Sequence, residues 1–179
     1  MSWNKVNFCV IFVVSALSLF FVEGKLQVDI HYESRCPDSS NFMLYQLRRV
    51  YPSIKDNVVI NFVPFGPKEC EGNKFQSCVL DVIGPNQDKQ TSFVICAMDF
   101  QKNARNCAQN MGLDMNKIDD CTKSQYGTNL QIQAERFSSP IISKSNFVPT
   151  IVYNGIYKAG DHWASLDDFS GVLKKLSTF

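Results

Sequence analysis

The sequence lacks several features that mark other classes of protein. It holds only two histidines, nine glycines and seven prolines in 179 residues, and its 18 Lys and Arg residues are balanced by 17 Asp and Glu residues. A net charge of +1 gives no basic surface of the kind that binds nucleic acid, so we expect no nucleic-acid partner. The few glycines and prolines, with 45% hydrophobic residues, exclude a low-complexity chain and favour one domain with a core.

Further absences concern sites. No Asn-x-Ser/Thr sequon occurs, so we do not expect a glycoprotein. The cysteines include no Cys-x-x-Cys pair. His31 and His162 lie far apart in the sequence, with His31 on a predicted strand and His162 beside Trp163 in a predicted polar loop. We therefore expect no metal site and no cofactor, and neither histidine is predicted to act as a base for a cysteine protease. No stretch rich in Pro, Gly and Ser is long enough to divide the chain.

The N-terminal segment has the plan of a signal peptide. Lys5 supplies a positive charge, and residues 8–22 form an apolar run that ends at Glu23-Gly24. The run is about fifteen residues, shorter than the roughly 20 that a membrane-spanning helix needs. We expect cleavage near Gly24, so that residues 1–24 are the signal peptide and residues 25–179 form one domain without a membrane span. An uncleaved membrane anchor is the alternative.

Cysteine content is the most informative number in the composition. Of seven cysteines, Cys9 leaves with the signal peptide and six remain. A secreted chain of this size with six cysteines passes through an oxidising compartment, so we expect disulfides, although the sequence allows 15 pairings. The remaining cysteines are Cys36, Cys70, Cys78, Cys96, Cys107 and Cys121.

Hydrophobic periodicity predicts a β-α-β unit at the start of the domain. Residues 25–32 alternate between apolar and polar side chains, which is typical of a strand. Pro37 suits the first turn of a helix, and apolar residues recur at helical spacing from Phe42 to Tyr51. Residues 57–65 form a short run rich in β-branched residues, which we interpret as a parallel neighbour of the first strand.

The second half of the chain has a different pattern. From about 66 to 139 the spacing predicts a helical insertion that carries five of the six cysteines. Residues 147–153 predict a strand, Asn154-Gly155 a hairpin turn, and residues 156–159 a returning strand. Residues 165–168 have the form of a capping box before a C-terminal helix. The expected order is βαβ, helical insertion, ββα.

Cys36 lies where the first strand meets the first helix. The attacking species in disulfide exchange is a thiolate, which the unpaired N–H groups at a helix N-terminus stabilise. A neighbouring cation, Arg35, could add to this effect. This order of elements, with Val148-Pro149-Thr150 before a later strand, resembles the α/β thioredoxin-like fold. The resemblance implies a cis peptide at Pro149 beside the active cysteine, whereas X-Pro bonds in general are mostly trans.

Longer motifs give a more specific resemblance. Tyr32-Glu33-Ser34-x-Cys36-Pro37-Asp38, Val148-Pro149-Thr150 and Asn154-Gly155 resemble the gamma-interferon-inducible lysosomal thiol reductase family, particularly its short arthropod members. The signature block of that family reads C-Q-H-G-x-x-E-C-x-x-N-x-x-x-x-C, and its last five fixed positions are matched here. The resemblance implies a thiol reductase of endosomes, lysosomes or secretions that reduces protein disulfides at acid pH. The matched positions are Gly66, Glu69, Cys70, Asn73 and Cys78.

Two departures from the family bear on its chemistry. The second cysteine of the family's Cys-x-x-Cys pair is here Ser39, and the block's Cys-Gln-His is here Val63-Pro64-Phe65. A hydroxyl cannot resolve a mixed disulfide as a thiolate does. We therefore expect a monothiol reductase or isomerase in which Cys36 is the nucleophile, Ser39 replaces the resolving thiol, and a low-molecular-weight thiol acts as reductant. Its partners are disulfide-containing proteins, and Val148 and Pro149 would shape the substrate groove.

The same departures leave alternatives open. Cys36 could instead be a buried structural thiol, and the chain a secreted binding protein that has lost reductase chemistry. Whether it is an enzyme is thus not decided by the sequence. Four of the five insertion cysteines are expected to form two structural bridges, and the spare one could pair with Cys36 or with another chain. We expect secretion, with the lysosome as the alternative, and the sequence does not indicate an oligomeric state.

Overall fold

The computed structural model describes residues 24–66 and 70–177. The predicted signal peptide, residues 1–24, lies outside this range except for Gly24. Among the described residues, no helix combines the length and apolar character needed to cross a membrane.

A three-stranded sheet forms the centre of the domain. Strand β1 (Leu26–Tyr32) lies in the middle, with β2 (Val58–Pro64) parallel on one side and β3 (Thr150–Tyr153) antiparallel on the other. Ile30 of β1 is opposite Phe62 of β2 and Ile151 of β3, and all three side chains are buried. The central strand is buried along almost its whole length because helices cover both faces of a sheet of this type.

The predicted helix between β1 and β2 is confirmed. It comprises α1 (Pro37–Asn41), the π-helical segment η1 (Phe42–Leu47) and α2 (Arg48–Ile54), which follow one another without a break. Phe42, Met43 and Leu47 are the buried apolar residues of the middle segment. The helix continues past Pro52, which lies in its last turn.

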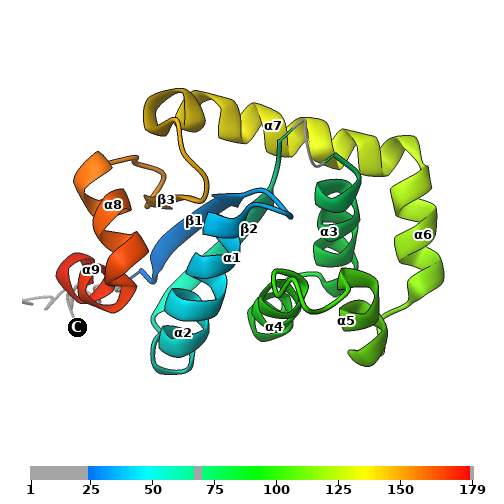
Figure 1. The fold of residues 1–179 in the computed structure, drawn as a ribbon, viewed down its shortest axis with the longest axis horizontal. Coiled ribbons are helices and arrows are strands. Elements are labelled where there is room, and N and C mark those ends of the chain that lie inside the picture. The colour runs from blue at the N-terminus through cyan, green and yellow to red at the C-terminus, as the bar shows by residue number, and fades with distance from the viewer. Residues whose placement is uncertain (1–23, 67–69, 178–179) are drawn as a thin grey trace, which may run out of the picture.

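The predicted helical insertion consists of five helices. They are α3 (Cys70–Ile83), α4 (Gln87–Ala97), α5 (Ala104–Asn110), α6 (Met115–Lys123) and α7 (Gln125–Ser145). In Figure 1, α3 to α6 lie together on one side of the sheet, and α7 runs from α6 back towards β3. The helical region extends beyond the predicted boundary at 139, because α7 continues through Pro140 to Ser145. Asn146, the residue after the helix, has a left-handed conformation.

The C-terminal part differs from the sequence prediction. Asn154 and Gly155 form the predicted turn, but only an isolated bridge between Tyr153 and Ile156 follows it, so the returning strand was wrong. Residues 159–167 instead form helix α8 (Ala159–Asp167), which precedes α9 (Phe169–Leu176). Figure 1 shows both helices on the opposite side of the sheet from α3 to α6.

The predicted capping box was also wrong. Ser165 lies inside α8, where its hydroxyl donates to the carbonyl of Asp161 at 2.6 Å and meets the hydroxyl of Tyr153. Its hydrogen-bonding capacity is therefore used within the core. Asp168 caps α9 instead, since its side chain accepts from the N–H of Gly171 at 2.8 Å. The observed order is βαβ, helical insertion, βαα.

Candidate active site

Cys36 is the residue that immediately precedes α1. Its N–H donates to the carbonyl of Glu33 at 3.2 Å, and its own carbonyl accepts from the N–H of Ser40 at 3.0 Å, so Cys36 occupies the N-cap position. Its side chain makes no capping hydrogen bond and is partly exposed. The sulfur atom thus lies at the positive end of a helix and is within reach of solvent.

The loop before β3 brings a second segment of the chain to this sulfur. The Cys36 Sγ contacts the carbonyl oxygen of Val148 at 3.6 Å, across 112 residues of sequence. The Val148–Pro149 peptide is cis, as the resemblance implied. Because β3 pairs with β1, Thr150 lies opposite His31, and the Val148–Pro149 pair therefore lies beside the end of the strand that leads to Cys36.

Ser39 lies one turn into the helix and is fully buried. Its hydroxyl has no hydrogen-bond partner among the residues that the structure describes. A buried hydroxyl without a partner costs free energy that a less polar side chain would not. The site therefore presents one partly exposed sulfur, with a buried oxygen where the second sulfur of a dithiol pair would lie.

A groove of about 380 Å³ lies next to this cysteine. Phe147 at its edge packs against the ring of Trp163, with 5.0 Å between the ring centroids, and Trp163 and Tyr45 are both exposed. The groove could hold an apolar or aromatic segment of a partner beside Cys36. Its lining residues are Asp38, Asn41, Phe42, Tyr45, Gln46, Phe147, Pro149 and Leu166.

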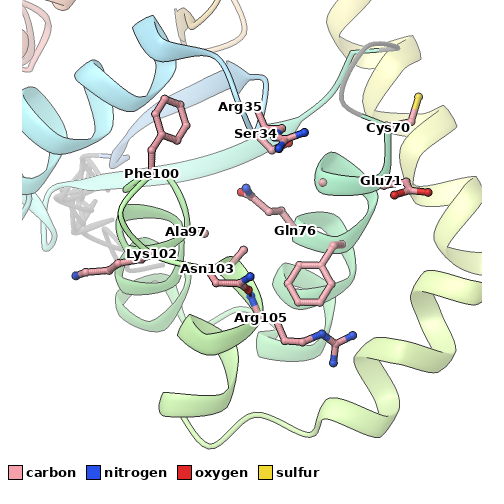
Figure 2. Close-up of a pocket in the computed structure, with 13 residues that line it drawn as sticks. Ser34, Arg35, Cys70, Glu71, Gln76, Ala97, Phe100, Lys102, Asn103 and Arg105 are labelled. Carbon is pink, nitrogen blue, oxygen red and sulfur yellow. The ribbon is translucent and has the colours of Figure 1, made fainter.

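A larger cleft of about 860 Å³ lies on the other side of the Cys36 loop. Figure 2 shows Ser34 and Arg35 at one end of this cleft and Arg105 at the other, with Gln76 between them. Its charges are largely balanced, because Arg105 pairs with Asp119 and Lys102 lies 3.7 Å from Asp99. The cleft therefore has polar and aromatic walls but no strong net field.

Two disulfides hold the helical insertion together. Cys78 and Cys121 link α3 to α6, and Cys96 and Cys107 link α4 to α5. Two bridges were expected among the five candidate cysteines of the insertion, and Cys70 is the one that belongs to neither bridge. It is exposed at the start of α3, where its sulfur donates to the carbonyl of Gly66 at 3.8 Å, and Cys36 is not bridged to it.

The two histidines are buried, and their hydrogen bonds are made with Ser138 and Ile151. His31 Nδ1 lies 2.8 Å from the hydroxyl of Ser138, and His162 Nδ1 accepts from the N–H of Ile151 at 3.3 Å. Burial lowers the pKa of each imidazole to about 4, although the nearby carboxylate of Asp29 opposes this shift at His31. His162 lies within α8 and not in the polar loop that the sequence predicted.

Sequence reasoning gave Asn73 no role, although it noted the residue in the signature block. Asn73 lies near the start of α3 with a fully buried side chain. Its Oδ1 accepts from the N–H of Ser34 at 2.8 Å, and its Nδ2 donates to the carbonyls of Phe65 at 2.6 Å and Gly66 at 3.2 Å. The one sequence signal for such a role was that Asn73 is a fixed position of the signature block, where an amide side chain follows a loop.

Known proteins resemble this chain in both fold and sequence. The structure is similar to DsbA from Chlamydia trachomatis, with a TM-score of 0.63 and 13% identity over 86% of this chain and 89% of the other. It is also similar to the oxidoreductase DsbA from Xylella fastidiosa, with a TM-score of 0.60 and 17% identity over 85% and 86% of the two chains. At these identities the likeness establishes the fold.

The sequence comparisons are more specific. Residues 27–111 match the family model for gamma interferon inducible lysosomal thiol reductase (GILT). The chain is 27% identical to a gamma-interferon-inducible lysosomal thiol reductase-like protein of Anopheles gambiae, over 86% of this chain and 77% of the relative. It is 30% identical to GILT-like protein 1 of Drosophila melanogaster, over 73% and 66% of the two chains.

The expected α/β thioredoxin-like fold is therefore confirmed. With a cysteine at the junction between β1 and α1, fold and sequence together define the class of thiol-disulfide oxidoreductases. Within that class, the chain belongs to the gamma-interferon-inducible lysosomal thiol reductase family.

Proposed function

We propose that this chain reduces or isomerises disulfides of other proteins through a single nucleophilic cysteine. The Cys36 thiolate attacks one sulfur of a substrate disulfide, a bond forms between Cys36 and that sulfur, and the second substrate sulfur leaves as a thiolate that takes up a proton. The product of this step is a mixed disulfide between Cys36 and the substrate.

The second step needs a thiol from outside the chain. Ser39 is buried and has no sulfur, so it does not resolve the mixed disulfide. A low-molecular-weight thiol attacks the Cys36 sulfur of the mixed disulfide, releases the substrate as a thiol and remains bonded to Cys36. A second molecule of the same thiol attacks that new disulfide, which frees Cys36 and yields the disulfide of the small thiol. Attack by another thiolate of the substrate instead completes an isomerisation.

One observation carries this proposal: the partly exposed Cys36 sulfur at the start of α1, 3.6 Å from the Val148 carbonyl. A sulfur in this position is accessible to a substrate disulfide, and the groove that includes Pro149 supports recognition of the surrounding polypeptide. The α3–α6 and α4–α5 bridges supply a rigid frame that takes no part in the exchange.

The proposal is tested with a denatured protein that contains disulfides. The purified chain should form a mixed disulfide at Cys36, identified by peptide mapping, and should turn over only when a thiol such as glutathione is added. Cys36→Ser should abolish both signals, whereas Cys70→Ser, the matched exposed cysteine, should retain them. Ser39→Cys should trap less mixed disulfide, because the new thiol resolves it within the protein. The proposal fails if no mixed disulfide forms at Cys36.

The alternative is a binding protein that uses the same fold without catalysis. The cleft of about 860 Å³ beside the Cys36 loop is the observation that favours it. Binding of a partner that is equally tight to the wild type and to Cys36→Ser, without exchange, would support this alternative.

The site of action belongs to the same proposal. The predicted signal segment supports secretion, and the family name, together with a relative from Carassius auratus named as a lysosomal thiol reductase, supports the lysosome as the alternative. Activity measured across pH 4.5–7.5 would distinguish them, because a lysosomal enzyme must retain exchange at the acid end.

A further inference from the structure

The side chain of Asn73 joins two segments that flank the candidate active site. On one side it accepts the N–H of Ser34, two residues before Cys36. On the other it donates to the carbonyls of Phe65 and Gly66, at the end of β2. One buried amide thus uses its acceptor on one loop and both donor hydrogens on the other.

The two loops pack closely against each other around this amide. A Cβ atom on Gly72 would collide with the side chain of Ser34, and one on Gly66 would collide with the carboxyl group of Glu33. Gly66 also has a φ of +111°, a conformation that other residues rarely adopt. Because both positions are glycine, Ser34 packs directly on the start of α3, and Glu33 packs directly on the end of β2.

Backbone contacts extend the same junction towards β1. The N–H of Phe65 donates to the carbonyl of Tyr32 at 2.9 Å, and the hydroxyl of Tyr32 donates to Gln76 of α3 at 2.7 Å. Three successive residues, 32 to 34, are therefore held against the segment that carries the signature block. Two motifs that are separate in the sequence form one structural unit.

We propose that Asn73 is a positioning residue for Cys36, which rests on the proposed function of that cysteine. The N–H of Cys36 donates to the carbonyl of Glu33, which closes a turn over residues 33–36. Asn73 holds Ser34, the second residue of this turn, and therefore fixes the backbone that leads to Cys36. Without the amide, the Ser34 N–H is buried and unpaired, and the turn adopts other conformations. The sulfur then leaves its place at the start of α1, next to the Val148 carbonyl.

The first test is hydrogen exchange of backbone amides in the wild type and in Asn73→Ala. In the wild type the Ser34 amide should be protected. In the variant, the amides of Ser34 and Cys36 should exchange about tenfold faster, the factor expected when one net hydrogen bond is lost. Gln87→Ala is the matched control: its side chain likewise accepts from a backbone N–H, that of Ile60, and donates to the carbonyl of Lys55, at another place in the fold.

The second test measures what the turn does for the sulfur. The rate of Cys36 alkylation in the native protein is divided by the rate for the same residue in the urea-unfolded protein, with both rates measured at the same pH. This ratio should fall about threefold in Asn73→Ala, the size of effect that a helix N-terminus has on an anion, and should not change in Gln87→Ala. A variant that is only less stable would show no such change in the ratio.

The outcomes separate the two proposals. An unprotected Ser34 amide in the wild type, or equal exchange of Ser34 and Cys36 in Asn73→Ala, overturns the role of Asn73, and these measurements need no enzymatic activity. An unchanged alkylation ratio with faster exchange also overturns it, because the turn would then move without effect on the sulfur. If Asn73→Ala does not fold, both measurements are made on Asn73→Gln, which keeps the amide but displaces it by one methylene group, and the same outcomes apply. Absence of a mixed disulfide at Cys36 would overturn the proposed function alone.

Discussion

Burial of His31 should make the stability of this protein depend on pH. The imidazole is fully buried and its pKa is lowered to about 4 from an ordinary value of 6.5, mainly because burial disfavours its charged form. Between these two values the unfolded chain binds more protons than the folded one, so the free energy of unfolding falls as pH falls from 6.5 towards 4. For these two values the loss at pH 5, relative to pH 7.5, is about 2 kcal/mol.

The assay is urea denaturation of the oxidised protein at pH values from 5 to 7.5. His31→Gln cannot take up this proton, so its free energy of unfolding should depend on pH less than that of the wild type by about 2 kcal/mol over the range. The control is Tyr153→Phe, which loses a buried hydroxyl that stays neutral throughout because burial raises its pKa, and which should shift the curve without changing its slope. Equal pH dependence in the wild type and His31→Gln would refute the reasoning.

Three further predictions concern the bridges, the buried serine and the groove. Replacing both cysteines of the α3–α6 bridge, which spans 43 residues, by alanine should lower the free energy of unfolding by about 4 kcal/mol. The same change at the α4–α5 bridge, which spans 11 residues, should lower it by about 3 kcal/mol. A larger loss at the α4–α5 bridge, measured by urea denaturation, would contradict this prediction. Ser39→Ala should leave stability equal or up to about 1 kcal/mol higher, whereas Ser165→Ala, which loses two hydrogen bonds, should cost about 1 kcal/mol or more, and equal costs would contradict the burial argument. Tyr45→Ser should raise the KM for an unfolded protein disulfide about threefold with little change in kcat, and an unchanged KM would show that the groove does not bind substrate.

Local patterns in the sequence were sufficient to predict the elements that position Cys36. Alternation over residues 25–32 predicted β1, and helical spacing after Pro37 predicted the helix that follows Cys36, because side-chain periods of 2 and 3.6 are properties of the backbone itself. The pattern over residues 147–153 predicted the next strand, but β3 comprises only Thr150–Tyr153, and the Val148–Pro149 pair lies in the loop before it, beside the sulfur.

Other predictions failed because distant parts of the chain decide them. Asn154 and Gly155 both adopt positive φ, as a tight turn requires, but α8 begins at Ala159, so the chain after the turn does not continue as a strand. His162 lies in that helix and not in a loop. A turn signal fixes the direction of a few residues, whereas a strand exists only if a partner with open hydrogen-bonding groups lies beside it.

The sequence by itself determined the class of fold and the place of Cys36 at the junction of β1 and α1. Only the tertiary structure decided which cysteines pair, because 15 pairings satisfy the sequence and only the packing of α3 on α6 and α4 against α5 brings the bonded atoms together. It also decided that Ser39 is buried and that Asn73 reaches the loop before Cys36. Residues 34 and 73 become neighbours only when the start of α3 packs against the end of β1, and that contact has no local signature in the sequence.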